Sequence, residues 1–446
     1  MKLSGVRIVV LVVLVLTSLS LSAQQPTQQP AQKSNALLSD KLNDDLPKWL
    51  SFSGEVRGRF EGFAGGKFQS DNSDFYFLER VRLNLKIQPA DWLKFVFQGQ
   101  DAHALGKDNV PASSPYQDAM DLRLGYLELG DVERKPVSFR AGRQELAFGD
   151  ERLIGSADWL NTARSFDALR SVFRVDGFRI DAFAASVVKI HDGQFNEYVP
   201  GTLLYGLYAS TPSMVPKATV EPYFLWRRAS NIALETGGRG VMNFGTVGFR
   251  WVGQLPDHFD YGTEMARQAG SVGTDTVGAW AGHWVLGYTL SNLRLQPRFG
   301  VEYNYASGDS NSTDGHRGTF DQLYPTGHDK YGLADQVGWK NIRNARGGVD
   351  LKPTAKWQIR SRYEAWWLAD PHDALYDAAS NVVAKVASGT AGRFVGQELD
   401  FVAVYDVSRA MKAGAGYGHI FPGTFLKHAT PGESYDFPYA MLTYRF

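Results

Sequence analysis

Cationic side chains spaced two residues apart are the first feature of the sequence that could do chemistry. They occur as Arg57 with Arg59 and again as Arg80 with Arg82. A guanidinium group stays charged at physiological pH and can bind a carboxylate through two parallel hydrogen bonds. A spacing of two places both side chains of a pair on the same face of a β-strand. The two pairs therefore predict a basic patch that could bind an anionic ligand.

The residues around the second pair show which kind of element carries these cations. From Arg80 onward, polar side chains alternate with the apolar Val81, Leu83 and Leu85. Alternation with a period of two predicts a β-strand that has one polar and one apolar face. About eighteen such segments follow one another between Gly54 and the C-terminus, an even number within the range of outer-membrane barrels. Alternation alone leaves two architectures open, because the polar face could meet solvent in a soluble sandwich or line the lumen of a membrane barrel.

Three features favour the membrane barrel, with the apolar face toward lipid and the arginines toward water. Aromatic residues recur near the segment ends, as in the girdles of membrane proteins: Trp92, Tyr126, Trp226, Trp284, Trp357 and Tyr444. A long all-β chain without a spanning helix can satisfy its backbone in lipid only as a closed barrel. The last segment, FPYAMLTYRF, ends on Phe446 and resembles the signal that barrel assembly machinery reads. The sequence thus predicts an all-β, single-domain transmembrane antiparallel β-barrel of about eighteen strands.

The N-terminus has the features of a secretory signal peptide. Basic residues precede the apolar run Ile8–Leu16, and small residues follow it. The run is shorter than the roughly 20 residues that a retained membrane anchor needs, so we expect residues 1–23 to be cleaved off. Residues 24–48 begin as a Gln- and Pro-rich stretch and are expected to form a flexible periplasmic tether. Residues 49–446 would then form the barrel, in the outer membrane of a Gram-negative cell.

The composition excludes several other classes of function. The 47 basic and 47 acidic residues balance, so no basic excess suits a nucleic-acid partner. Without any cysteine, disulfides, thiolate metal sites and cysteine nucleophiles are excluded. The short motifs of serine hydrolases, zinc proteases and P-loop enzymes are absent, and we expect neither enzymatic activity nor a cofactor. A surface hydrolase with a Ser–His pair near Ser307, Ser310 and His316 stays a remote alternative.

One acidic stretch has the oxygen density of a cation site. It contains Asp309, Asn311 and Asp314. Their spacing misses the EF-hand pattern by one residue and the closing glutamate is absent, so we expect a polar loop and no resident metal. The whole segment from Gly308 to Lys340 is too long for an idle connection and could fold over or into the barrel.

Cations on the predicted inward faces are the candidate substrate-binding residues. They are Arg57, Arg59, Arg80, Arg82, Lys94, Arg123, Arg140, Arg179, Arg360 and Arg362. A polyanion that crosses a pore needs several weak cationic sites, so that it can enter and also leave. Acidic residues also fall on inward faces, among them Glu55, Glu61 and Asp181. A ladder of Arg–Glu pairs that only stiffens the wall of a neutral porin is therefore the alternative.

Three longer stretches are similar to those of a known family. They are GRQELAFGDERLIGSADWLNTARSFDALR (Gly142–Arg170), the segment Ser307–Ile342, and GYGHIFPGTFLKH with SYDFPYAMLTYRF at the C-terminus. Together they resemble the alginate export family, from about Trp49 to Phe446. The resemblance implies an eighteen-stranded barrel with a basic conduit for an anionic poly- or oligosaccharide such as alginate, passed outward with a periplasmic polysaccharide-export scaffold as a partner.

The resemblance also adds two arginines to the candidate binding residues. Arg143 and Arg152 match the family's motif within the Gly142–Arg170 stretch. Arg143 falls on the apolar parity of its strand, which predicts a position at a rim or bulge. Because the family is broader than alginate producers, a general or oligosaccharide-specific uptake porin stays open as an alternative. Besides the saccharide, the expected partners are outer-membrane lipids and the barrel assembly machinery.

Overall fold

The computed structural model describes residues 37–108, 115–212, 217–235 and 237–446. The predicted signal peptide and the first part of the predicted tether, within residues 1–36, lie outside the described residues. Cleavage of residues 1–23 therefore stays a prediction.

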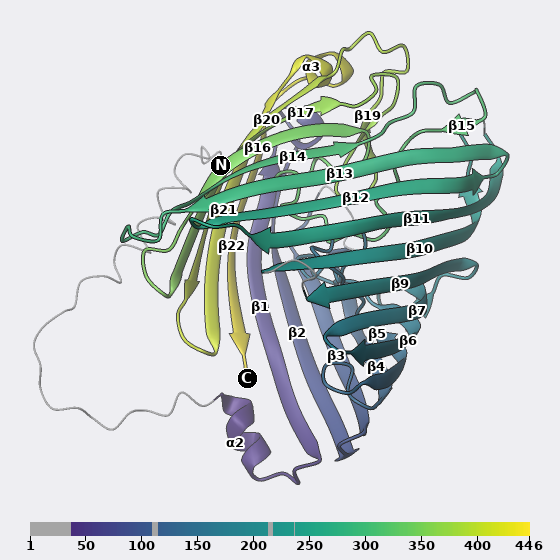
Figure 1. Ribbon diagram of the computed structural model, residues 1–446. Coiled ribbons are helices and arrows are strands. Elements are labelled where there is room, and N and C mark those ends of the chain that lie inside the picture. The colour runs from purple at the N-terminus through teal and green to yellow at the C-terminus, as the bar shows by residue number, and fades with distance from the viewer. Residues whose placement is uncertain (1–36, 109–114, 213–216, 236) are drawn as a thin grey trace, which may run out of the picture. The chain divides into compact units, whose positions relative to one another are not determined.

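Eighteen long strands follow one another around a closed antiparallel barrel (Figure 1). Each strand pairs with the strand before and after it, and β22 pairs back onto β1, with Arg445 opposite Glu55. The barrel strands are β1 (Leu50–Ala64), β2 (Ser73–Ala90), β3 (Leu93–Leu105), β4 (Asp118–Leu129), β5 (Val137–Gln144), β6 (Phe166–Val175), β7 (Phe178–Lys189), β9 (Thr202–Pro212), β10 (Ala218–Ala233), β11 (Arg239–Gln254), β12 (Phe259–Val272), β13 (Asp275–Thr289), β14 (Arg298–Ala306), β16 (Ile342–Leu351), β17 (Trp357–Leu368), β20 (Phe394–Asp406), β21 (Met411–Pro422) and β22 (Tyr435–Arg445). The predicted fold class is confirmed.

Short elements occupy the connections between these strands. They are η1 (Gly66–Phe68), β8 (Glu197–Tyr198), β15 (His316–Arg317), β18 (Leu375–Tyr376), β19 (Val382–Ala384) and α3 (Thr424–Ala429). A further helix, α2 (Leu38–Asp44), precedes β1. None of the described helices is both long and apolar enough to cross a membrane.

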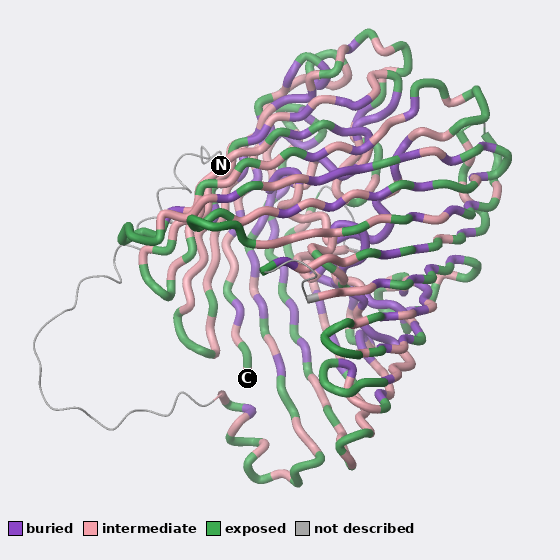
Figure 2. The backbone as a smooth tube through the Cα atoms, viewed as in Figure 1, coloured by how far each residue is buried: buried purple, intermediate pink, exposed green. Residues whose placement is uncertain are grey.

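Strand β2 shows how the two faces of the wall are assigned. Its inward Arg80 has 1% of its surface exposed, whereas its outward Leu83 is 57% exposed. The tube in Figure 2 repeats this alternation along neighbouring strands. The apolar face therefore points away from the lumen and the arginines point into it, as the alternation predicted for a membrane barrel.

The two ends of the barrel differ in the length of their connections. The short-turn end holds the start of β1, the end of β22 and tight turns such as residues 176–177 between β6 and β7. Asp176 and Gly177 have φ angles of 47° and 83°, as a two-residue type I′ hairpin requires. The long-loop end carries L3 (residues 145–165), L7 (307–341) and L8 (369–393), numbered by their order among the connections at that end. Outer-membrane barrels place short turns in the periplasm and long loops outside the cell.

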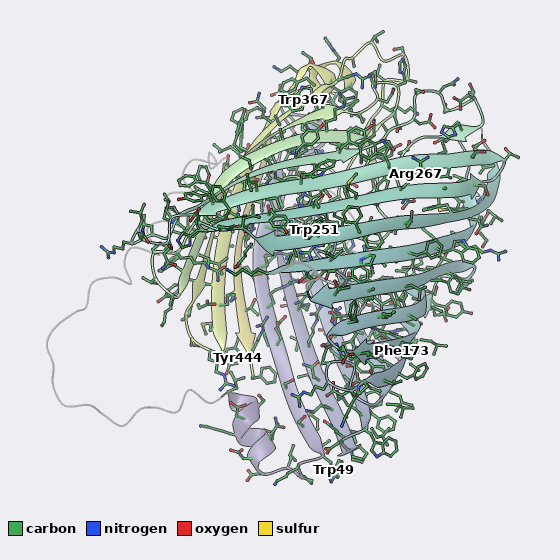
Figure 3. All side chains as sticks on the ribbon, viewed as in Figure 1. Trp49, Phe173, Trp251, Arg267, Trp367 and Tyr444 are labelled. Atoms are coloured by element: carbon green, nitrogen blue, oxygen red, sulfur yellow. The ribbon has the colours of Figure 1, made fainter. Side chains whose placement is uncertain are left out.

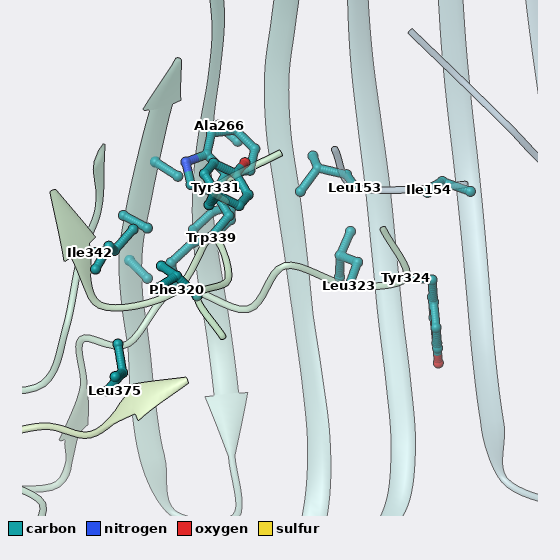
Figure 4. Close-up of a cluster of buried hydrophobic side chains, with 14 of the residues drawn as sticks. Leu153, Ile154, Ala266, Phe320, Leu323, Tyr324, Tyr331, Trp339, Ile342 and Leu375 are labelled. Atoms are coloured by element: carbon teal, nitrogen blue, oxygen red, sulfur yellow. The ribbon is translucent and has the colours of Figure 1, made fainter. Parts of the chain in front are cut away.

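Loops L3 and L7 fold into the lumen and build an apolar core there. Ile154 of L3 and Tyr324 of L7 form an isolated parallel β-bridge. Around them lie the buried side chains of Leu153, Phe320, Leu323, Tyr331 and Trp339 (Figure 4). The indole of Trp339 donates a hydrogen bond to the carbonyl of Tyr305 on β14 at 3.0 Å. Of the two placements open for the segment from Gly308 to Lys340, the structure shows the one inside the barrel.

The described part of the predicted tether is attached to the barrel. Residues 37–48 contain α2, and the side-chain amide of Asn43 both donates to the carbonyl and accepts from the N–H of Phe52, each at 2.8 Å. Strand β22 ends opposite Glu55, so no strand of the described residues pairs with β1 on this side at Phe52. This segment thus differs from the expected flexible chain, because a side-chain amide completes the free strand edge.

Candidate functional site

The arginine pairs of β1 and β2 hold the tip of L3. Arg57 donates hydrogen bonds to the carbonyl oxygens of Asp158 at 2.8 Å and Leu160 at 3.1 Å. Arg59 donates to the carbonyl of Trp159 at 2.5 Å. These guanidinium groups are buried, and their several donors match the closely spaced carbonyls of the loop. The predicted basic patch therefore faces the lumen, where L3 covers it.

Asp158 is the charged centre of this contact. Its carboxylate lies 2.7 Å from Arg82 and 3.2 Å from Arg80, and Arg80 also pairs with Glu55 at 2.6 Å. Burial alone would raise the pKa of Asp158, but Arg80, Arg82 and Arg57 outweigh burial and hold that pKa well below its ordinary value. Asp158 is therefore ionised at physiological pH and pairs with the arginines of the wall.

Trp159 joins L3 to L7. Its ring lies 3.9 Å from the guanidinium of Arg59 and stacks on the imidazole of His328 at 3.7 Å, with 5° between the ring planes. The ring of Tyr439 on β22 meets it edge-on at 4.9 Å. Cation–π and aromatic contacts of this kind favour one defined geometry. One side chain thus connects the barrel wall, L3 and L7 inside the lumen.

Arg152 attaches L3 to a second part of the wall. It donates to the hydroxyl of Tyr331 in L7 at 3.0 Å and lies 3.3 Å from the carboxylate of Glu302 on β14. Asp150 of the same loop lies 3.3 Å from Arg152, and His283 of β13 also contacts it. The second arginine implied by the family motif is therefore buried in the contact between two loops and the wall.

Loop L7 reaches the wall through acidic residues. Asp329 lies 2.7 Å from Arg346 on β16 and also pairs with Arg360 on β17. Asp321 accepts two hydrogen bonds from Arg227 on β10, both at 2.7 Å. Burial raises the pKa of Asp329, yet the neighbouring arginines outweigh burial and keep that pKa below its ordinary value. L7 is thus held by salt bridges on both sides of the lumen.

The remaining predicted cations of β3, β4 and β5 point inward and are paired. Lys94 and Arg140 share the carboxylate of Glu128, at 2.7 Å and 2.5 Å. Arg123 pairs with Glu145 at the start of L3. These contacts form a ladder of paired opposite charges along the inner wall, as the alternative interpretation of the sequence described.

Two further predicted cations lie nearer the short-turn end. Arg179 pairs with Asp181 at 2.6 Å, and Arg362 pairs with Asp350 at 2.5 Å. Pairing with the wall does not decide between structural support and substrate binding. The binding role of these residues therefore stays a prediction.

Arg143 lies at the long-loop rim and not in the lumen. Strand β5 pairs with β6 without a register shift, so Arg143 has the outward parity of the exposed Val137. Arg143 then pairs with Asp167, the residue opposite it on β6, at 2.9 Å, and Asp167 has the same parity as the exposed Leu169. Arg143 also donates to the carbonyl of Asn196 at 2.7 Å. Arg143 thus lies at the rim because of its parity on β5, and its role in substrate binding stays a prediction.

Replacing Arg143 with alanine should destabilise the barrel. The change removes a bidentate carboxylate contact and a buried carbonyl contact, and hydrogen bonds to charged groups contribute about 1.5–3 kcal/mol each. The temperature at which the SDS-resistant folded band disappears measures the effect. Arg267, an exposed arginine of β12, provides the control (Figure 3). An Arg267→Ala variant that unfolds as early as Arg143→Ala would contradict the assignment.

Cavities lie on both sides of the contact between L3 and L7. A cavity of about 840 Å³ on the long-loop side is lined by Lys67, Tyr76, Trp159 and Asp335, among others. A cavity of about 310 Å³ on the short-turn side is lined by residues that include the cations Arg298, Lys352 and Arg360. Another, of about 690 Å³, contains Lys217 and Arg250. The lumen therefore keeps cation-lined space below the loops.

Several of these cations were missed by the sequence prediction. Arg298 has the parity of the inward Glu302 on its strand, so the alternation rule does place it on the inward face. Arg250 likewise has the parity of Thr246, which is buried inside the barrel. Lys352 follows β16 in a turn, where no periodicity identifies the inward side.

The acidic stretch of L7 forms turns. Asp309 accepts a hydrogen bond from the N–H of Asn311 at 3.0 Å, and Asp314 accepts one from the N–H of His316 at 2.8 Å. Within the described ranges, no group of three or more histidines and acidic residues is arranged to hold a metal ion. The oxygen atoms of this stretch serve the backbone of the loop.

Solved structures with a similar barrel are outer-membrane proteins of Gram-negative bacteria. Pseudomonas aeruginosa OpdQ superposes with a TM-score of 0.61 at 12% identity, over 90% of this chain and 99% of that chain. P. aeruginosa OpdK, solved with vanillate, has a TM-score of 0.59 at 10% identity, over 89% and 98%. Acinetobacter baumannii OccAB4 has a TM-score of 0.59 at 10% identity, over 89% and 97%. At such low identity the likeness shows the fold alone, a closed antiparallel β-barrel.

The family comparison covers nearly the whole barrel. No protein with a curated description matches the chain. The family model described as alginate export matches residues 48–439, which include the wall, L3 and L7. The predicted family resemblance is confirmed, and the chain belongs to the alginate export family.

Proposed function

We propose that the protein is an outer-membrane channel for the passive passage of an anionic saccharide of the alginate type, with export as the direction. Family membership supports the substrate class, and the shared fold with outer-membrane channels supports a pore. One observation carries the proposal: inward cations remain partly exposed below the loops, with Arg360 keeping 37% of its side-chain surface accessible. The cations Arg298 and Lys352 line the same cavity.

The geometry of these cations suits transient binding. Arg298 is shared between Asp260 at 2.5 Å and Asp350 at 3.3 Å, and Arg360 pairs with Asp329. A uronate carboxylate would replace one wall carboxylate without leaving a buried charge unpaired, which keeps each site weak. Several weak sites in series allow a charged chain to enter and to leave.

The contact between L3 and L7 favours a second candidate function, an oligosaccharide-specific uptake porin. Trp159 and His328 stack within the lumen, so a polymer requires these loops to move. A short oligosaccharide could use the cavities beside them. The two functions share the cationic wall and differ in the length of chain that passes.

Planar-bilayer recordings with the refolded protein test both functions. We expect anion selectivity, measured from reversal potentials in a KCl gradient, and current block by uronate oligomers but not by neutral oligosaccharides of equal length. Arg360→Ala should weaken the block, whereas Lys356→Ala, in the adjacent turn and outside the cavity lining, should not. Block that persists for long oligomers supports export of a polymer, and block limited to the shortest supports the porin.

Other outcomes would reject the proposal. Cation selectivity or indifference to uronates would leave a general porin whose Arg–carboxylate ladder only stiffens the wall. Ester cleavage that is lost in Ser307→Ala would indicate the surface hydrolase. In this structure the Ser307 hydroxyl donates to the carbonyl of Gly318 at 2.7 Å.

The pH dependence of conductance follows from the two aspartates that hold the loops. Asp158 and Asp329 both have depressed pKa values. A carboxylate of this kind stabilises the folded contact above its unfolded pKa of about 3.9 and loses that contribution as the pH falls through its native pKa. We therefore expect constant conductance from about pH 5 to 8 and a rise only below about pH 4. A conductance step between about pH 5 and 8 would contradict control of the loops by these two aspartates.

A further inference from the structure

The helix α2 carries an apolar stripe that the barrel does not cover. Leu38 and Leu42 lie one helical turn apart and are 59% and 53% exposed. Ser39, beside them, is buried, and Asn43 bonds the backbone of β1. The helix therefore uses one side to contact the barrel and leaves two leucines uncovered among the residues described.

The contacts of α2 with the barrel fix the position of the helix next to the short-turn end of the outer wall. The last residue, Phe446, exchanges backbone hydrogen bonds with Gly54 at 2.7 Å and 3.0 Å. Asn43 makes the next equivalent contact along the same edge of β1, at Phe52. A second contact is the salt bridge between Asp40 of the helix and Arg409, which lies 3.6 Å away in the turn between β20 and β21. The helix thus lies beside the free edge of β1, just below the C-terminus (Figure 1).

The stripe is continuous with the apolar outer surface. Phe52 and Val56 share the outward face of β1 and are exposed, and Trp49 is exposed between the helix and the strand (Figure 3). Charged residues of both signs surround the stripe: Lys41 and Asp44 are exposed, and the side chains of Arg409 and Arg445 are 63% and 65% exposed. An apolar stripe flanked by charged residues and an aromatic is characteristic of helices that lie in a membrane interface.

We propose that α2 is an interfacial anchor that inserts Leu38 and Leu42 into the phospholipid leaflet at the short-turn end. Its function would be to seal the free edge of β1 at the boundary with lipid, where an unpaired backbone group is costly. The proposal rests on the outer-membrane location and not on the transport of any solute. Its failure can therefore be distinguished from failure of the channel function.

The absence of native cysteine makes a site-specific test direct. Single-cysteine variants carrying a small fluorophore are reconstituted into phospholipid vesicles, some of which contain lipids brominated on the acyl chains. We expect the label in Leu42→Cys to be quenched severalfold more by brominated lipid than by dissolved iodide. Lys41→Cys, on the adjacent side of the same helix, should show the opposite preference. Leu83→Cys, on the lipid side of β2, is the positive control.

Each outcome supports or overturns the anchor. Quenching of the Leu42→Cys label like that of Leu83→Cys supports it. Quenching by iodide places the stripe in water and overturns it. Protection from both quenchers means that protein covers the leucines, which also overturns it. If the Leu83→Cys label itself is not quenched by lipid, the barrel is not embedded, and the anchor fails with the membrane location.

Discussion

Replacing Trp159 with alanine should raise single-channel conductance about twofold or more, because this side chain joins L3 to L7 within the lumen and pore-lining constrictions set conduction. The change removes the stack on His328, the contact with Arg59 and the edge contact with Tyr439. The backbone of L3 stays held, since Arg57 binds the carbonyls of Asp158 and Leu160 and not the indole. The lumen should therefore widen while the barrel remains folded.

Trp367→Ala is the matched control for this experiment. Trp367 follows the inward Trp366 on β17, and its ring is tilted against that of Phe394 with 5.6 Å between the centroids (Figure 3). The Trp367→Ala substitution removes the same volume of aromatic side chain as Trp159→Ala and should leave the conductance unchanged. Equal conductance of Trp159→Ala and the unmodified protein would mean that the loops do not limit the current. A matching increase in both variants would point to a general loosening of the barrel.

Replacing Asp329 with asparagine should raise the ratio of anion to cation permeability about threefold, because fixed charges along a pore set its electrostatic selectivity. Asp329 neutralises Arg346 and Arg360 together, so its loss releases positive charge next to the short-turn cavity. Arg346 keeps one carboxylate partner, Glu364 at 3.3 Å, whereas no second carboxylate pairs with Arg360 among the described residues. Block by uronate oligomers should also strengthen.

Asp314→Asn provides the control within the same loop. Asp314 is exposed and bonds the backbone of His316, and no cation pairs with it in the described part of the chain. The charge change is identical, but it lies outside the lumenal cavities described above. The reversal potentials of Asp329→Asn and Asp314→Asn should therefore differ. A shift of the same size in both would show that selectivity follows the total charge of L7 and not the freed arginines.

The barrel itself was predictable because its signal is local. The alternation around Arg80 and Leu83 needs only the pleat of one strand to separate two faces, and insertion into lipid decides which face is outside. The rim position of Arg143 was predictable for the same reason, since its parity conflicts with that of its strand. The family motifs located L3 and L7 without revealing their conformation.

The pairing of the site residues depended on contacts between distant parts of the chain. Arg57 and Asp158 lie about one hundred positions apart, and no periodicity indicates that a loop will cover the basic patch. The same holds for Trp159 with His328 and for Asp329 with Arg360. By itself the sequence determined the strands, their two faces and the inward direction of most of the cations. Only the tertiary structure decided which cations L3 buries and which remain accessible, because buried charges require partners that the folding of the loops brings to them.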